Sequence, residues 1–321
     1  MRLVFFGTPE FAVPTLERLL AGPHSVELVI SQPDRRRGRG RKTSPSPVSE
    51  VALREEIPLL RPESVNSEEV LEAFRATEAD LGVVVAFGQF IGKPLREGTR
   101  LGYLINGHGS ILPEYRGAAP IQRAILDGKT ETGISVMRLE REMDAGDSAL
   151  ILRTPILSEE NTAELSERLA VLCADAILQG LASIDKSEVT WTPQDSSQVT
   201  YAEKIMKEDG ELHWEESAQT LSCRIRATAP KPGAVTLLDG DPLRILKAHV
   251  DDAPCDLPPG TVQVRDDGPL RIATGQGWIV PETLQRAGGK ALERETFLRG
   301  HSIAHGTVLV APRAKPATPA A

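Results

Sequence analysis

The chain has 321 residues, of which 40% are hydrophobic and 26% charged; this is ordinary for a soluble globular protein and long enough for two domains. Its net charge of −8 excludes a uniformly basic surface, so binding to a nucleic acid would need a local patch of cations. The apolar run at 1–6 is too short for a signal peptide, and no segment approaches the roughly 18 apolar residues of a membrane span. Three scattered cysteines predict neither a disulfide framework nor a zinc site, so we expect a cytoplasmic protein without a membrane partner.

In the first half of the chain, short apolar runs alternate with stretches of helical periodicity. The predicted strands are 3–6, 26–30, 81–86 and 102–106, and the predicted helices are 11–20, 48–56, 67–77, 118–126 and 161–182. This alternation predicts an α/β fold with a doubly wound, mostly parallel sheet and right-handed crossovers. Ligands of such sheets bind beyond the carboxyl ends of the strands, and Asn106 and His108 lie at such an end.

The turn after the first predicted strand reads Gly7-Thr-Pro-Glu10. A dinucleotide-binding protein would carry Gly-x-Gly-x-x-Gly there, because its glycines allow a tight turn and a close approach to the pyrophosphate. Only one of those glycines is present. The sequence therefore argues against a nicotinamide-dependent dehydrogenase.

A cluster of cations interrupts the pattern between the second predicted strand and the next helix, where connections usually have only about two to six residues. A solvated flexible loop would explain such a run. Its place near the ligand-binding end of the sheet instead favours contact with the phosphates of RNA, and the absence of aromatic residues argues against stacking on bases. The six cations of this basic cluster are Arg35, Arg36, Arg37, Arg39, Arg41 and Lys42.

The second half of the chain has a different pattern. A polar, Pro-containing stretch begins at 189, and after Trp214 short strand-like runs are separated by Asp-Gly, Pro-Gly and Gly-Pro turns. That spacing predicts a small β barrel of the OB type. We therefore expect a first domain over 1–188, a linker over 189–208, a β-barrel domain over 209–310 and a disordered tail over 311–321.

The side chains with the most chemical information are Asn106, His108 and the aspartates of Asp144-Ala-Gly-Asp147. A carboxamide donates to a developing oxyanion, an imidazole exchanges a proton near neutrality, and a carboxylate orients the imidazole or relays the proton. Around one pocket, these groups suit the transfer of an acyl or formyl group to an amine. Taken alone, two polar residues at a strand end are more often simply part of the surface.

Several motifs together carry a resemblance that extends to about residue 310. They are Phe-Gly-Thr-Pro-Glu-Phe at 6–11, Gln-Pro-Asp-Arg at 32–35 with Arg-Gly-Arg-Lys at 39–42, Val-Val-Val-Ala-Phe-Gly at 83–88, Ser-Ile-Leu-Pro-Glu-Tyr-Arg-Gly-Ala-Ala-Pro-Ile-Gln at 110–122, Met-Asp-Ala-Gly-Asp at 143–147, Thr-Tyr-Ala-Glu-Lys-Ile-Met-Lys-Glu at 200–208 and Ile-Arg-Ala at 225–227. With these motifs the chain resembles the methionyl-tRNA formyltransferase family.

The resemblance implies an enzyme that transfers the formyl group of 10-formyltetrahydrofolate to the amino group of initiator methionyl-tRNA, without a metal. It implies a Rossmann-like formyltransferase domain first and a tRNA-binding β barrel second, and we expect a monomer. Catalysis is then assigned to Asn106, His108 and Asp144, and tRNA binding to the basic cluster. The residues assigned to the folate cosubstrate are Ser110, Ile111, Leu112 and Pro113.

Two departures from the family pattern keep alternatives in view. Both neighbours of His108 are glycines, where the tRNA enzymes more often have an aliphatic residue and an alanine, and sugar-amine formyltransferases often have Gly-Ser after the histidine. Ala229-Pro-Lys231-Pro stands where the family tends to have an aromatic residue between the prolines. One alternative is a folate-dependent formyltransferase for a nucleotide-sugar amine or a small ribonucleotide amine, which needs no basic insertion. The other is a non-catalytic RNA-binding module, against which the intact Asn106, His108 and Asp144 set argues.

Overall fold

The computed structural model describes residues 1–37, 42–265 and 268–312. The chain divides into two compact units, and each has a hydrophobic core of its own. The first unit extends beyond the predicted boundary at 188, as far as Ala202. The first unit comprises Met1–Pro120, Glu131–Pro155 and Ser166–Ala202, and the second comprises Ile121–Thr130, Ile156–Leu165 and Glu203–Ala321.

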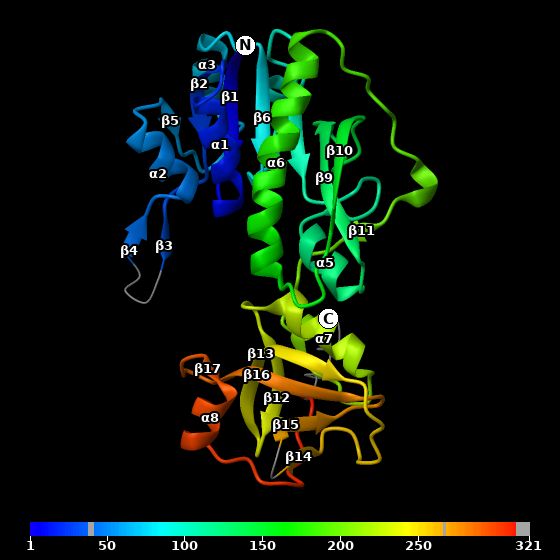
Figure 1. Ribbon diagram of the computed structural model, residues 1–321. Coiled ribbons are helices and arrows are strands. Elements are labelled where there is room, and N and C mark those ends of the chain that lie inside the picture. The colour runs from blue at the N-terminus through cyan, green and yellow to red at the C-terminus, as the bar shows by residue number, and fades with distance from the viewer. Residues whose placement is uncertain (38–41, 266–267, 313–321) are drawn as a thin grey trace, which may run out of the picture. The chain divides into compact units, whose positions relative to one another are not determined.

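In its described part, the first unit contains a seven-stranded sheet with the order β10-β9-β7-β6-β1-β2-β5 (Figure 1). The strands from β7 to β5 pair in parallel, which confirms the predicted doubly wound, mostly parallel sheet. β9 and β10 add an antiparallel edge that the sequence does not predict. The strands are β1 (Arg2–Gly7), β2 (Ser25–Ile30), β5 (Leu59–Leu60), β6 (Leu81–Val85), β7 (Leu104–His108), β9 (Glu131–Arg138) and β10 (Ser148–Pro155).

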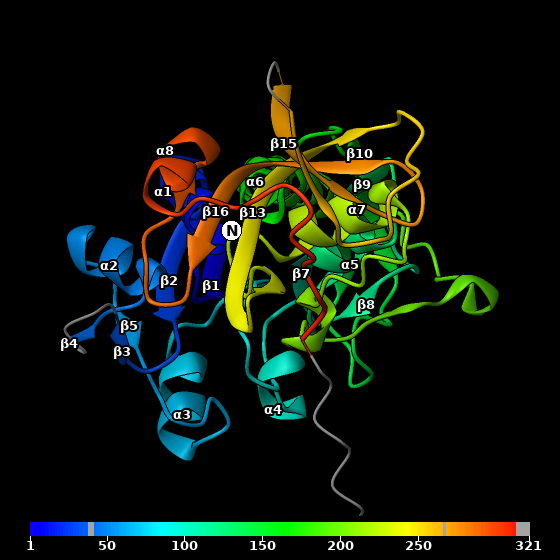
Figure 2. The same cartoon turned by 90° about the horizontal axis from the view of Figure 1, so that it is seen from below.

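Helices cover both faces of this sheet: Figure 2 shows α1 and α6 on one face and α3 and α4 on the other. Side chains alternate between the faces along a strand, so Val4 and Phe6 of β1 both join the core beneath α3. There the rings of Phe6 and Phe74 lie 6.3 Å apart, centroid to centroid. Among the described residues, no helix combines the length and apolar character that crossing a membrane requires. The helices are α1 (Val13–Leu20), α2 (Pro47–Arg54), α3 (Glu68–Ala76), α4 (Lys93–Arg96) and α6 (Thr162–Asp185), while α5 (Pro120–Leu126) belongs almost entirely to the second unit.

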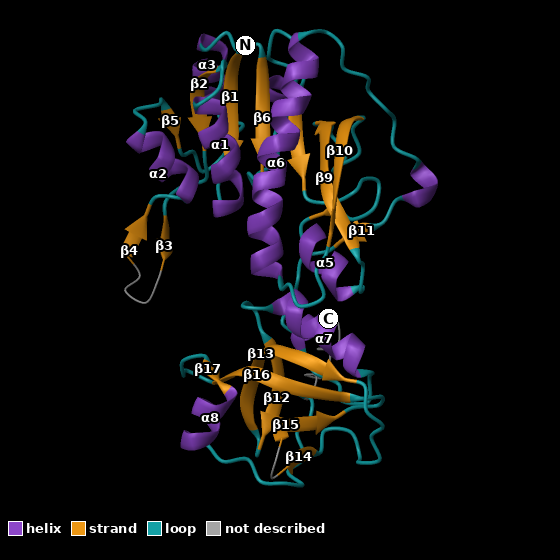
Figure 3. Cartoon of the chain, in the orientation of Figure 1, coloured by secondary structure: helices purple, strands orange, loops and turns teal. Residues whose placement is uncertain are grey.

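The second unit is built on an antiparallel sheet with the order β12-β13-β16-β15-β14, with β17 paired to β16 (Figure 3). Leu237 and Val310 exchange backbone hydrogen bonds of 2.8 and 3.2 Å, and Thr261 beside β14 forms a bridge with Val308. The terminal segment therefore joins both edges of the sheet, as expected of a small β barrel. The elements are α7 (Ala218–Thr228), β12 (Ala234–Leu238), β13 (Asp241–Asp251), β14 (Val262–Arg265), β15 (Gly268–Ala273), β16 (Trp278–Arg286), β17 (Leu292–Glu293) and α8 (Arg294–Gly300).

The polar stretch after α6 is hydrogen bonded to the first unit. Thr192 and Ser148 exchange two backbone hydrogen bonds of 2.9 Å, which places the stretch along the free edge of β10. Further on, β11 (Tyr201–Ala202) pairs in parallel with β8 (Arg116–Gly117). Up to Ala202, the segment expected as a linker is thus part of the first unit.

Candidate active site

Asn106 and His108 lie within the carboxyl end of β7, on the same face of the sheet. A Cβ atom built on Gly107 points towards α6, where it would lie 2.5 Å from the Sγ of Cys173. Because side chains alternate along a strand, both neighbours of Gly107 face away from α6. The carboxamide of Asn106 is half-buried and makes no hydrogen bond with the described residues, so its NH₂ group is available to a ligand.

The imidazole of His108 is buried, with one ring nitrogen hydrogen bonded and the other facing a carboxylate. Its Nε2 lies 2.8 Å from the carbonyl oxygen of Tyr115, and its Nδ1 lies 3.6 Å from Oδ2 of Asp144. A carbonyl oxygen only accepts, so Nε2 is the donor in the first contact. In the neutral ring, Nδ1 therefore carries the lone pair and faces the carboxylate.

Asp144 lies in the turn between β9 and β10 with a φ of +52°, in the left-handed region that aspartate enters more readily than most residues. Its Oδ2 accepts a hydrogen bond of 2.8 Å from the backbone N–H of Gly117. Gly117 itself has a φ of +123°, and a Cβ atom there would lie 2.8 Å from the carbonyl oxygen of Ala202. The structure thus brings together the three residues predicted for catalysis, and the Gly117 backbone holds the carboxylate next to His108.

The turn predicted to bind folate is pinned to β9. Ser110 Oγ donates to the carbonyl oxygen of Glu114 at 2.6 Å, while the carbonyl of Ser110 accepts from Ser135 Oγ at 2.7 Å. The same Ser135 hydroxyl accepts from the backbone N–H of Leu112 at 3.0 Å. Ile111 packs near Gly133 of β9, where its Cγ1 would lie 3.2 Å from an added Cβ.

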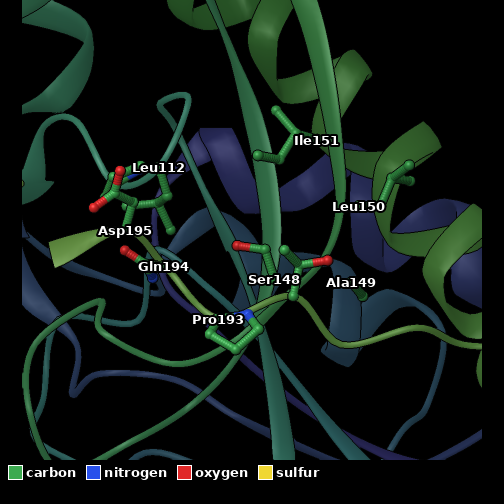
Figure 4. A pocket seen from close by; sticks show the side chains of 10 residues that line it. Leu112, Ser148, Ala149, Leu150, Ile151, Pro193, Gln194 and Asp195 are labelled. Carbon is green, nitrogen blue, oxygen red and sulfur yellow. The ribbon is translucent and has the colours of Figure 1, made fainter. Parts of the chain in front are cut away.

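A cavity of about 220 Å³ lies beside this turn (Figure 4). Leu112 and Pro113 border it on one side, residues 148–151 of β10 on another, and residues 192–195 on a third. The hydroxyl of Ser148 is buried there without a hydrogen-bond partner among the described residues. Of the four residues predicted to contact folate, Leu112 and Pro113 border the cavity.

The turn after β1 is occupied by internal hydrogen bonds. Thr8 Oγ1 donates to the carbonyl oxygen of Phe87 at 2.9 Å and accepts from the backbone N–H of Gln32 at 3.4 Å. Gln32 Nε2 donates to the same carbonyl at 2.9 Å. These contacts tie the carboxyl ends of β1, β2 and β6 together, in agreement with the absence of a dinucleotide motif at Gly7.

The basic cluster has regular structure at its described ends. The backbone of β3 (Arg35–Arg37) pairs antiparallel with β4 (Lys42–Ser44), and Figure 1 shows this hairpin projecting from the β2 side of the sheet. The two described ends of the cluster are therefore paired strands and not the solvated flexible loop that would also explain such a run of charges. Arg39 and Arg41 lie outside the described residues.

Three residues that the sequence does not predict as site residues also contact the groups predicted for catalysis, directly or through a neighbour: Arg116, Gln194 and Thr200. Arg116 and Thr200 lie in two of the motifs that carry the resemblance, at 110–122 and 200–208. Nothing in the polar stretch around Gln194 marks it. Within the described residues, no three His, Cys, Asp or Glu side chains gather as ligands of a metal would.

The fold and this site define a class of protein. Residues 1–181 match the family of formyl transferases, and residues 204–302 match the formyl transferase C-terminal domain. The chain therefore belongs to the formyl transferase family. Among its relatives, the methionyl-tRNA formyltransferase of Hydrogenovibrio crunogenus is 40% identical over 308 residues, which are 96% of this chain and 98% of the relative.

Two solved structures share the fold. HypX from Aquifex aeolicus, in complex with tetrahydrofolic acid, matches with a TM-score of 0.64 and 18% identity over 93% of this chain and 47% of HypX, so the chain spans about half of HypX. An N-formyltransferase from Helicobacter canadensis, in complex with folinic acid and dTDP-3-aminofucose, matches with a TM-score of 0.63 and 14% identity over 87% of this chain and 98% of that protein. At such low identity, these likenesses establish the fold and leave the substrate to other arguments.

Proposed function

We propose that this protein transfers the formyl group of 10-formyltetrahydrofolate to the amino group of initiator methionyl-tRNA, in the cytoplasm and as a monomer. The observation that carries the proposal is the 40% identity to the methionyl-tRNA formyltransferase of Hydrogenovibrio crunogenus over nearly the whole of both chains. The proximity of Asn106, His108 and Asp144 supports it, since transfer to an amine needs a group for the oxyanion and a path for a proton.

The reaction balances between two substrates and two products. The amine nitrogen forms a bond to the formyl carbon, and the carbonyl electron pair moves onto oxygen to give a tetrahedral oxyanion. When this intermediate collapses, the bond from carbon to N10 of the folate breaks. The attacking nitrogen loses one proton and N10 gains one.

The three catalytic side chains have separate roles in this scheme. Asn106 donates to the oxyanion from its available NH₂ group. His108 accepts the proton of the attacking nitrogen at Nδ1, because Nε2 is already committed to the carbonyl of Tyr115. The imidazolium then lies 3.6 Å from the carboxylate of Asp144, which stabilises it until the proton passes to N10.

The folate cosubstrate binds beside the turn at Ser110–Pro113. Leu112 and Pro113 offer an apolar wall for the flat pterin ring, next to the 220 Å³ cavity. Ser110 and Ile111 hold that wall in place through their contacts with Glu114 and β9.

The acceptor is held in part by the basic cluster. Arginine and lysine side chains on a projecting hairpin suit the phosphate backbone of an RNA, which needs cations without base-specific geometry. The net charge of −8 does not attract a polyanion such as RNA. The attraction therefore has to come from the local cluster of cations.

The deciding experiment offers the protein 10-formyltetrahydrofolate with either charged initiator tRNA or a panel of sugar amines. We expect formyl-methionyl-tRNA as the product. The glycines on both sides of His108 and the fold shared with the Helicobacter canadensis enzyme make a nucleotide-sugar amine the second candidate. Formylation of a sugar amine, with no formyl-methionyl-tRNA formed, would replace the proposal by that candidate.

A further inference from the structure

We infer that the segment 194–202 positions the pair Asp144 and His108. Gln194 acts on the turn that carries Asp144, and Thr200 acts on His108 through Tyr115. The inference rests on the proposed function only in that the reaction uses Asp144 and His108. Gln194 and Thr200 are positioning residues, since neither is placed to touch a reacting atom.

Gln194 clamps the turn that carries Asp144. Its Nε2 donates to the carbonyl oxygens of both Asp144 and Gly146 at 2.8 Å. A single amide thus fixes two carbonyl groups, two residues apart, in the turn where Asp144 has the unusual φ of +52°. The direction of the Asp144 side chain is set by the peptide planes on which these bonds act.

Arg116 determines which way the Gln194 amide points. Its Nε and Nη2 donate to Gln194 Oε1 at 3.0 and 2.9 Å, and its side chain is buried. Guanidinium groups only donate and carbonyl oxygens only accept, so the amide has a single orientation that satisfies all four contacts. The Gln194 side chain therefore uses its complete hydrogen-bonding capacity to join Arg116 to the Asp144 turn.

Thr200 supports the other member of the pair. Its Oγ1 accepts from the backbone N–H of Tyr115 at 2.9 Å, and its carbonyl accepts from the backbone N–H of Arg116 at 2.9 Å. Tyr115 has a φ of +59°, and its carbonyl is the group that holds Nε2 of His108. The Thr200 hydroxyl thus fixes a strained residue on which the orientation of the imidazole depends.

The segment is itself anchored on the first unit ahead of Gln194. The guanidinium carbon of Arg138 lies 4.2 Å from the ring centroid of Trp191 and 4.7 Å from that of Tyr103. These cation–π contacts and the β-bridge between Thr192 and Ser148 hold residues 191 and 192 against the first unit. Gln194 therefore reaches the Asp144 turn from a fixed base.

Gln194→Glu gives the sharpest test, because it keeps the shape of the side chain and the acceptor that faces Arg116. It replaces the donor that faces the carbonyls of Asp144 and Gly146 by a second acceptor. We expect kcat to fall about 10- to 100-fold, as for a catalytic group displaced by about 1 Å. KM for both substrates should change much less than kcat, because all four hydrogen bonds of the Gln194 amide are made to the protein, although its side chain borders the cavity beside the turn proposed for folate.

Two comparisons separate positioning from a general loss of structure. Gln198→Ala, at an exposed residue of the same segment whose amide contacts only Asp195 among the described residues, should leave kcat unchanged. In an Asp144→Asn background, Gln194→Glu should lower kcat little further, because the group it orients has already been removed. A full additional loss in that background, or a raised KM at normal kcat, would overturn the role of Gln194.

Thr200 is tested by a pair of substitutions. Thr200→Val removes the hydroxyl with little change of shape and should lower kcat, whereas Thr200→Ser keeps the hydroxyl and should restore it. Equal rates in both variants would overturn the role of Thr200. Should the wild type formylate a sugar amine and not methionyl-tRNA, the proposed substrate fails, but the same variants should lower kcat for that amine. A normal kcat of Gln194→Glu on methionyl-tRNA would instead overturn the positioning role of Gln194 and leave the proposed substrate intact.

Discussion

Nδ1 of His108 lies 3.6 Å from Oδ2 of Asp144, while the opposite ring nitrogen donates to the carbonyl of Tyr115. The pair is therefore arranged so that a proton taken up at Nδ1 arrives next to a carboxylate. Asn106, on the same face of β7, is the residue proposed to donate to the oxyanion. This geometry leads to distinct expectations for the three side chains.

Substitution of the three side chains proposed for catalysis should reduce turnover to different extents. His108→Ala or Asp144→Asn should lower kcat by about 10²–10⁴, the range for a positioned acid or base. Asn106→Ala should lower it on the order of 10²–10³, as for a lost oxyanion donor. Single-turnover rates at saturating methionyl-tRNA measure these changes, and folate and tRNA affinities serve as controls. A near-normal rate in Asp144→Asn would remove that residue from the mechanism.

Replacing the cations of the basic cluster by alanine should weaken tRNA binding without affecting the chemistry. Each lost phosphate contact should flatten the dependence of log K on log salt by roughly 0.7–0.9. The slope is measured from tRNA affinity between low and moderate salt, with folate affinity as the control. Formyl transfer should partly recover at high tRNA concentration. Unchanged affinity and slope in the multiple variant would make the hairpin a solvated insertion.

The sequence predicts four of the five parallel strands, because they are mainly apolar runs that alternate with helical patterns, whereas β5, with only two residues, is missed. The runs at 3–6 and 81–86 correspond to β1 and β6. β9 and β10 are not predicted, because no helix lies between two antiparallel strands to separate them in the sequence pattern. The hairpin at the basic cluster is missed because charge and glycine content outweigh strand propensity in so short a segment.

For the site, the sequence supplies the catalytic residue types but not what holds them. Asn106 and His108 are two positions apart on one strand, so their shared face follows from strand geometry alone. The contact of Gln194 with Asp144 joins residues 50 positions apart. It depends on the path of the polar stretch along β10, and no local pattern encodes that path.

Stability at high pH should depend on the Cys173 thiol. Burial raises the pKa of the Cys173 thiol from its ordinary value of 9.0 to about 12. The unfolded chain then loses this proton at lower pH than the folded chain. The stabilising difference is therefore complete below about pH 9 and is lost as the pH rises towards 12, by at most about 1.4 kcal/mol per pH unit.

Urea unfolding of the wild type and of Cys173→Ala between pH 7 and pH 10.5 measures this effect. The difference in free energy of unfolding between the two proteins should be flat at neutral pH. It should shift in favour of the alanine variant above about pH 9. Parallel curves over the whole range would show that the thiol titrates alike in both states.

The glycine between Asn106 and His108 should be coupled to Cys173 of α6. A Cβ atom on Gly107 would lie 2.5 Å from the Cys173 Sγ and 3.5 Å from side-chain carbons of Ile177, so these two residues fill the space that a larger strand residue would need. Gly107→Val should therefore lower the free energy of unfolding by about 1–3 kcal/mol through overpacking. The displacement of β7 should lower kcat as well.

Cys173→Ala removes the sulfur that the valine would meet, so it should restore much of the stability and activity of Gly107→Val, although it leaves a small cavity in the wild type. Thermal unfolding and single-turnover rates of the two single variants and the double variant give the coupling between the sites. Cys223→Ala is the matched control, because Cys223 is also buried but belongs to the second unit. If Cys223→Ala rescues Gly107→Val as well as Cys173→Ala does, or if the two changes at 107 and 173 add independently, the packing argument is wrong. A rescue specific to Cys173 would show that its side chain on α6 occupies the space that a larger residue at position 107 would need.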